Sequence, residues 1–135
     1  IVDKNLFECS VHKVIINNID FIRLKKAIRL VILGLSNHYT IQTMNLDINK
    51  INNAIKLKSA DICDLFCYRG AEEFTDYQIN NFLRLKEHTY QDCFTFVGAM
   101  RLNNNQVDKV IEYKNDGLLD YYALENAGCT NLFEK

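Results

Sequence analysis

Apolar residues recur along most of the chain at the three- and four-residue spacing of an amphipathic helix. The pattern is clearest in residues 54–72, AIKLKSADICDLFCYRGAE, where it predicts one helix, a break at 59–60 and a second helix. The buried stripe of the second helix is expected to consist of Ile62, Leu65 and Phe66. Gly70 is expected to end this helix, because helix C-termini favour a residue that tolerates positive φ.

Three weaker copies of this helix-break-helix pattern are predicted elsewhere in the chain. Residues 99–115 align with the first copy without a gap, which pairs Ala99 with Ala54 and puts Asn115 in the place of Gly70. Residues 13–26 align after one deletion, and residues 121–135 form a shorter terminal copy. The chain is therefore predicted to be built from helical repeats.

Further helices are expected between these copies, at residues 22–35, 40–46 and 74–87. In the first of these helices one buried face is expected to comprise Ile28, Val31, Ile32 and Leu35. Residues suited to cap a helix N-terminus are Asp47, Thr75 and Asp92.

The first copy resembles an ankyrin repeat, with the closest likeness over residues 51–73. The likeness rests on an Ala-led first helix, a polar break, an apolar second helix and the ending Gly70-Ala71-Glu72. The TPLH turn of standard repeats is missing. The resemblance implies an all-α domain of degenerate, stacked helix-turn-helix repeats over residues 1–135, which binds another protein and has no catalytic role.

The resemblance also implies which residues contact the partner, since turn tips and the concave face usually carry the contacts of such repeats. The residues expected to do so are Tyr68, Arg69, Glu72, Glu73, Phe74, Tyr113, Lys114, Asn115 and Asp116.

A helix-turn-helix regulator that binds nucleic acid is the first alternative. Residues 39–57 have a short helix, a turn and a second helix, as such a domain requires. The second helix would face the groove of the nucleic acid with Asn49, Lys50, Asn52, Asn53 and Lys56. The net charge of −1 and the lack of an overall basic patch weigh against this alternative.

A single globular helical bundle without repeats is the second alternative, similar to viral Bcl-2-like interaction proteins. In that fold the helix at residues 90–102 would be the buried centre, and a surface groove would bind a helix of the partner.

Length and composition agree with one intracellular domain. The chain has 135 residues, of which 48% are hydrophobic and 24% charged, and it contains no proline. It begins with Ile, which indicates a fragment of, or a product processed from, a longer chain. Its longest apolar run is too short to span a membrane. No phosphate-binding loop or nucleophile motif indicates an enzyme.

The five cysteines are irregularly spaced and odd in number, which does not predict a disulfide framework. Buried free thiols in a reducing compartment, the cytoplasm, are expected instead. Cys63 and Cys67 are four residues apart on one predicted helix, with His88 and Cys93 as the nearest further ligands, but the spacing matches no standard zinc site. We therefore expect no metal and no cofactor.

Overall fold

The computed structural model of this chain describes residues 21–129. This part of the chain contains eight α-helices joined by short turns and no β-strand. The all-α class predicted from the periodicity of apolar residues is therefore confirmed. The predicted copies at residues 13–26 and 121–135 lie partly outside the described residues.

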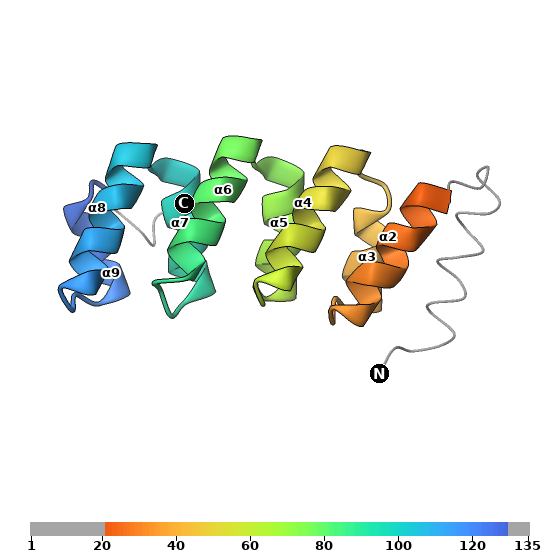
Figure 1. Cartoon of the computed structure of the whole chain (residues 1–135), viewed down its shortest axis with the longest axis horizontal. Helices are drawn as coiled ribbons and strands as arrows, with labels where there is room; N and C mark the ends of the chain where they lie inside the picture. Colours follow the sequence, from red (N-terminus) through yellow and green to blue (C-terminus); the bar gives the residue numbers. More distant parts are fainter. Residues whose placement is uncertain (1–20, 130–135) are drawn as a thin grey trace. The chain divides into compact units, whose positions relative to one another are not determined.

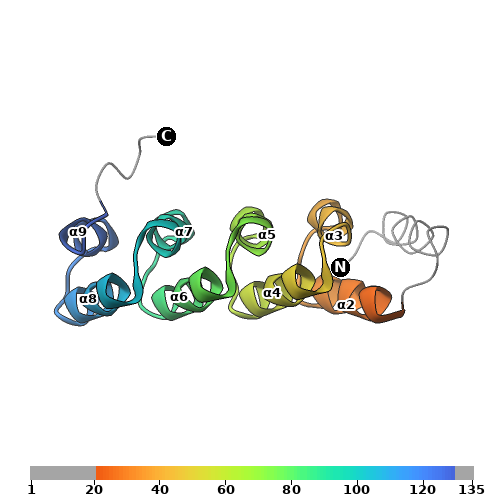
Figure 2. The same cartoon turned by 90° about the horizontal axis from the view of Figure 1, so that it is seen from above.

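The helices are α2 (Phe21–Ile32), α3 (Asn37–Thr43), α4 (Ile48–Ser59), α5 (Asp64–Glu73), α6 (Asp76–Lys86), α7 (Asp92–Arg101), α8 (Asn104–Asn115) and α9 (Asp120–Asn126). The chain divides into two compact units, with the boundary between Glu72 and Glu73. In unit 1, α2 and α4 form one layer and α3 and α5 the other (Figures 1 and 2). In unit 2, α6 and α8 form one layer and α7 and α9 the other (Figure 2).

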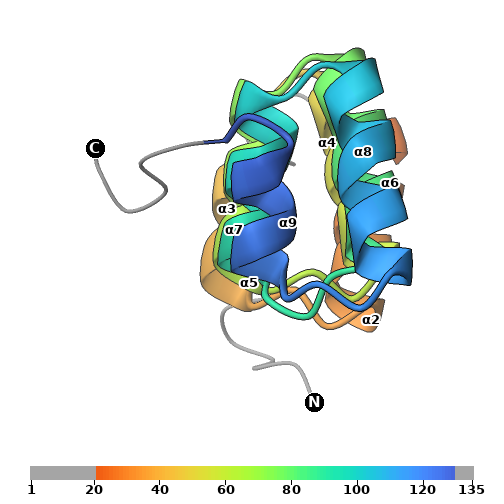
Figure 3. The same ribbon diagram turned by 90° about the vertical axis from the view of Figure 1, so that its left-hand side faces the viewer.

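Among the described residues, each unit therefore contains two helix hairpins. Unit 1 contains α2/α3 and α4/α5, and unit 2 contains α6/α7 and α8/α9. Figure 3 looks along unit 2 onto its last hairpin, where α8 and α9 pack side by side. Each hairpin has one helix in each layer, so the apolar stripes of both helices face the interior of their unit.

The hairpins recur at a constant interval along the sequence. The first helices α4, α6 and α8 begin at Ile48, Asp76 and Asn104, and the second helices α5, α7 and α9 begin at Asp64, Asp92 and Asp120. The step from each start to the next is the same in both series, and the step from the start of α3 at Asn37 to the start of α5 is shorter by a single position. A repeat of helix pairs is present, but its interval is much shorter than the predicted one, which led from Ala54 to Ala99.

The predicted alignment is wrong because it matched Ala54, on the first helix of one hairpin, with Ala99, on the second helix of another. Both alanines are completely buried, so their identity does not tell the two kinds of helix apart. The residues that occupy the position of Ala54 in the next two hairpins are Phe82 and Val110, which are also completely buried. Burial recurs at this position, whereas side-chain size does not.

The predicted inner face of α5 needs correction. Leu65 is 44% exposed, because α5 begins at Asp64 and its first turn faces solvent. Gly70 lies within α5 and is buried, so it does not end the helix. The buried positions on this helix are Cys67, Gly70 and Ala71. Positive φ occurs instead at glycines that follow helices, such as Gly34 and Gly117.

The predicted inner face of α2 is also shifted. Ala27 and Leu30 are buried, whereas Ile28 is 38% and Ile32 77% exposed. Leu35 is buried as predicted, although it follows the helix. The true stripe is narrower than the isoleucine-rich sequence indicated, because three isoleucines of α2 lie on its outer side.

Two of the three predicted N-caps are confirmed. The side chain of Asp47 accepts a hydrogen bond from the Lys50 backbone N–H at 2.9 Å, and Thr75 forms a reciprocal capping box with Gln78. The third prediction is wrong, because Asp92 is the first residue of α7 and its side chain pairs with Lys86 instead. In the next hairpin, Asn103 caps α8 at the position equivalent to Thr75.

The core of unit 2 is aromatic. The Phe74 ring stacks on that of Phe96, with centroids 4.7 Å apart, and Phe82 meets both rings edge-on. All three side chains are at most 6% exposed. Gly98 lets α9 approach closely, since a Cβ atom there would lie only 2.7 Å from a methyl group of Leu124.

A lysine–aspartate ion pair spans the turn of three successive hairpins. The pairs are Lys58–Asp64, Lys86–Asp92 and Lys114–Asp120, with N–O distances of 2.6–2.7 Å. Each joins the end of a first helix to the start of the second helix, and both members recur at the interval of the helix starts.

Two of these three aspartates also hold hairpins together within a unit. In unit 2, Asp120 accepts hydrogen bonds from the backbone N–H groups of Tyr90 and Gln91 at 2.8 and 3.0 Å. In unit 1, Asp64 accepts one from the Ser36 N–H at 3.1 Å. The aspartate therefore fixes its own turn and the turn of the preceding hairpin with one carboxylate.

Removal of the Asp120 carboxylate is expected to destabilise unit 2. Lys114 and Asp120 are each 6% exposed, so Asp120→Ala leaves a buried ammonium and two backbone N–H groups without their acceptor. We expect a loss of roughly 3 kcal/mol in the free energy of unfolding. The control is Asp108→Ala, which breaks a more exposed pair with Arg84 and should cost less than about 1 kcal/mol. Urea unfolding followed by circular dichroism measures both, and equal losses would contradict a structural role for Asp120.

Candidate binding groove

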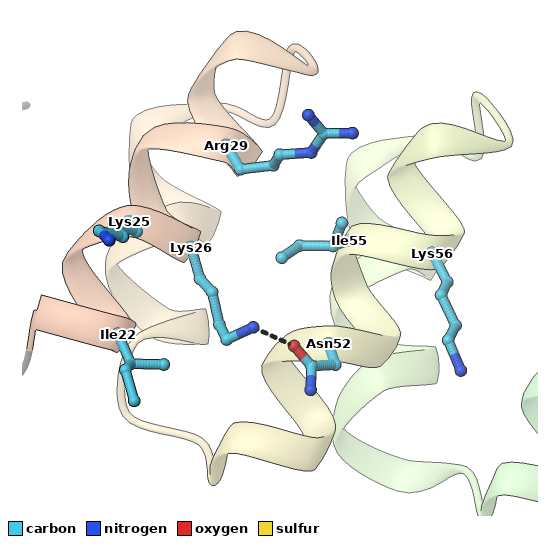
Figure 4. Close-up of a pocket in the computed structure, with 7 residues that line it drawn as sticks. All are labelled: Ile22, Lys25, Lys26, Arg29, Asn52, Ile55 and Lys56. Carbon is cyan, nitrogen blue, oxygen red and sulfur yellow. Dashed lines mark hydrogen bonds between the residues drawn. The ribbon is translucent and has the colours of Figure 1, made fainter.

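A groove of about 580 Å³ lies on the outer side of unit 1. Figure 4 shows its lining, which comes from α2 and α4 alone. The lining residues are Ile22, Lys25, Lys26, Arg29, Asn52, Ile55 and Lys56.

Helical spacing places these side chains on one surface. In α2, Ala27 and Leu30 face the core, so the positions one turn apart at Lys25 and Arg29 point outward. In α4, Ile51 and Ala54 are completely buried, and the lining residues of this helix lie beside that buried stripe. The groove is therefore a consequence of packing two amphipathic helices side by side in one layer.

The groove has an unbalanced charge. Helices α2 and α4 together contain seven Lys and Arg residues and no Asp or Glu. Helices α6 and α8, at the same positions of the repeat, contain four Lys and Arg residues and three Asp and Glu residues. Residues 21–72 carry a formal charge of +4 and residues 73–129 carry −4, so the near-neutral total conceals a basic unit and an acidic one.

Three of the four cations in the groove have no counter-ion within the described part of the chain. Lys25, Arg29 and Lys56 make no ion pair or side-chain hydrogen bond there, whereas Lys26 donates a hydrogen bond to the side-chain oxygen of Asn52 (Figure 4). Lys25 and Arg29 also lie one helical turn apart, where like charges destabilise a helix by roughly 0.2–0.5 kcal/mol. Among residues 21–129, no ion pair therefore accounts for this grouping of cations.

Apolar side chains line the space between the cations. Figure 4 shows Ile55 directed from α4 towards α2, with Arg29 on one side of it and the Lys26–Asn52 pair on the other. Ile55 is half-buried and Ile22 is 60% exposed. The groove thus offers an aliphatic floor with a positively charged rim.

The predicted partner-contact residues are spread over two units. Tyr68, Arg69 and Glu72 lie on α5 and not at a turn tip, and the Tyr68 hydroxyl donates a hydrogen bond to Glu72 at 2.8 Å. This bond and partial burial raise the pKa of Tyr68, with burial the larger cause. Glu73 ends α5 and is exposed.

In the second set of predicted contacts, Tyr113 is half-buried on α8, and Asn115 and Asp116 are exposed where that helix ends. Two predicted contacts are corrected by the structure. Phe74 is buried in the aromatic core of unit 2, and the Lys114 side chain is buried by its pair with Asp120. Neither side chain is accessible to a partner.

The residues expected to read nucleic acid do not form one face. Asn53 is buried and Lys50 donates a hydrogen bond to the Glu72 carbonyl, while Asn52 and Lys56 line the groove. The bundle alternative placed residues 90–102 at a buried centre. Instead α7 lies in one of the two layers of unit 2, with Met100 38% exposed.

The described cysteines differ in burial, and in the part of the chain that the structure describes no group of residues could hold a metal ion. Cys67 is buried and its thiol donates to the Ala54 carbonyl at 3.3 Å, whereas Cys63, on the preceding turn, is exposed. Burial raises the pKa of the Cys67 thiol to about 12. This supports the predicted role of a buried thiol for Cys67, but Cys63 and Cys93 are exposed.

Among residues 21–129, no helix is both long enough and apolar enough to cross a bilayer. Comparisons with known proteins give no relative, since no family model, curated protein or solved structure matches the chain.

Sequence reasoning missed the groove, although a signal was present. The net charge of −1 for the whole chain hides this signal, because basic residues in one part offset acidic residues in another. The absence of any acidic residue from α2 and α4 is visible in the sequence and would have indicated a basic surface.

Thiol labelling tests the environment of the cysteines. In the native chain at about pH 8, a maleimide should modify Cys63 and Cys93 rapidly and Cys67 only after unfolding, because burial and the raised pKa keep the Cys67 thiol protonated. Peptide mass spectrometry assigns the modified residues. Rapid native labelling of Cys67 would contradict its placement in the core.

Proposed function

We propose that this chain is a non-enzymatic interaction module that binds another protein on a surface built from repeated helix hairpins. The observation that carries this proposal is the groove of unit 1. Its lining combines three cations that have no counter-ion among the described residues with the apolar side chains of Ile22 and Ile55. A partner that supplies negative charge and apolar contact would use both properties.

The architecture supports the same function. In a repeat of helix hairpins the buried positions maintain the fold, so the outer positions are available for recognition. The position of Arg29 illustrates this independence. Equivalent residues in the next three hairpins are Lys56, Arg84 and Glu112, so the charge is reversed in the last hairpin, whereas the buried position at Ala54, Phe82 and Val110 stays apolar.

We further propose that the hairpins are degenerate repeats of the ankyrin kind. The helix-turn-helix unit and its stacking within each compact unit support this assignment. The interval from the start of α4 to the start of α6 is shorter than a standard ankyrin repeat of about 33 residues, and the TPLH turn is missing from the sequence. The shorter interval leaves no room for the β-turn extension of a standard repeat.

Nucleic-acid binding is a second candidate function with one supporting observation. Lys56 and Asn52, which were expected to face nucleic acid, lie in the groove beside Lys25 and Arg29. A cluster of cations attracts phosphate groups regardless of sequence.

Site-specific photo-crosslinking tests the proposed function. A photo-reactive residue at Ile55, in the groove, should give a discrete protein adduct in extract from the native source. The same residue at Ile111, the equivalent position of α8, is the matched control. We expect Arg29→Glu/Lys56→Glu to lower the adduct yield about tenfold, as loss of groove contacts would. Equal adducts at both positions, or adducts unaffected by charge reversal, would contradict the proposal.

A further inference from the structure

We infer that the groove of unit 1 receives an acidic amphipathic helix of the partner, with carboxylates one turn apart and an aliphatic side chain on the same face. This inference rests on the proposed function and names the chemistry of the partner. It concerns Lys25, Arg29 and Lys56 as charged contacts and Ile22 and Ile55 as apolar ones.

The spacing of the cations favours a helix as the bound element. Lys25 and Arg29 are four residues apart on α2, which corresponds to roughly 6 Å along the helix axis. Carboxylates at positions i and i+4 of a second helix have the same axial separation. A partner helix aligned with α2 can therefore place one carboxylate at each cation.

The floor of the groove requires an apolar contact as well. Ile55 projects between the two helices, flanked by Arg29 and by the Lys26–Asn52 pair (Figure 4). An aliphatic residue of the partner would cover Ile55 and exclude water from the charged contacts at its sides. The guanidinium of Arg29 suits a carboxylate in particular, because its two parallel N–H groups match the two oxygens.

The same lining argues against nucleic acid as the occupant. None of the seven lining residues is aromatic, so the groove offers no platform on which bases could stack. A phosphate backbone would use the cations and leave the isoleucines without a contact. An acidic amphipathic helix uses both kinds of side chain.

The charge distribution of the chain makes the attraction local. Residues 73–129 carry −4 and would repel an acidic partner, whereas residues 21–72 carry +4. At physiological salt, charges act over roughly 8 Å, so an acidic helix is attracted mainly where cations are concentrated. The groove of unit 1 is such a place.

Fluorescence anisotropy with designed peptides and the full chain tests the inference. The main probe is a labelled helical peptide with Glu at i and i+4 and Leu on the same face. Two matched probes replace Glu with Gln or Leu with Ser, and a labelled single-stranded oligonucleotide represents nucleic acid. We expect the main probe to bind at least about tenfold more tightly than each of the other three.

Protein variants locate the binding. Lys25→Gln/Arg29→Gln should weaken binding of the main probe by about tenfold. Both residues are exposed and form no ion pair with described residues, so the variant is expected to fold. Lys109→Gln, which removes an exposed cation of α8 in unit 2, should leave binding unchanged. Circular dichroism verifies the folding of each variant.

The outcomes separate this inference from the proposed function. Groove-dependent preference for the oligonucleotide would overturn the inference and favour the nucleic-acid alternative. A protein adduct at Ile55, together with equal binding of the Glu and Gln peptides, would overturn the inference while the interaction module stands. Absence of both the adduct and peptide binding would overturn both.

Discussion

The Lys–Asp pair at the turns of three of the four described hairpins is the interaction on which the rest of the structure depends. It joins the end of the first helix to the start of the second, and the remaining aspartate oxygen binds the backbone of the preceding hairpin in two cases, at Asp64 and Asp120. Without Asp120 at the turn between α8 and α9, the backbone N–H groups of Tyr90 and Gln91 in the preceding hairpin would have no acceptor. Because the pair lies at the turn, the apolar stripes between hairpins are free to vary in size while the hairpin geometry is kept.

Sequence periodicity was sufficient for the fold class and insufficient for the repeat register. Helical spacing is a local property, so the helices around Asp47 and Thr75 could be placed from their own sequence and caps. Register depends on which residues occupy equivalent sites in different hairpins. Alanines at 54 and 99 matched by identity, but one lies on the first helix of its hairpin and the other on the second helix. The recurring polar residues, such as the aspartates that begin the second helices, carry the register because each has a specific partner.

The sequence was sufficient to predict the charge of the candidate groove but not its shape. The lack of acidic residues in α2 and α4 is a property of the sequence, but nothing local shows that these two helices lie in one layer. The isoleucines of the same region lie largely outside the core. Ile28 and Ile32 were predicted to be part of a core, whereas the interior of unit 1 takes Ala27 and Leu30 from that helix. Apolar residues on an outer face therefore indicate a second surface that needs a partner.

The constant interval between hairpins also bears on how such a chain can change length. Each of three hairpins contains its own lysine and aspartate, and the bond to the previous turn uses backbone N–H groups that any residue except proline supplies. Duplication or deletion of one whole hairpin would therefore join turns that still fit each other, whatever side chains the outer faces display. Because none of the 135 residues is proline, any residue at these turns can supply such an N–H group, and recognition surface can be gained or lost in steps of one hairpin.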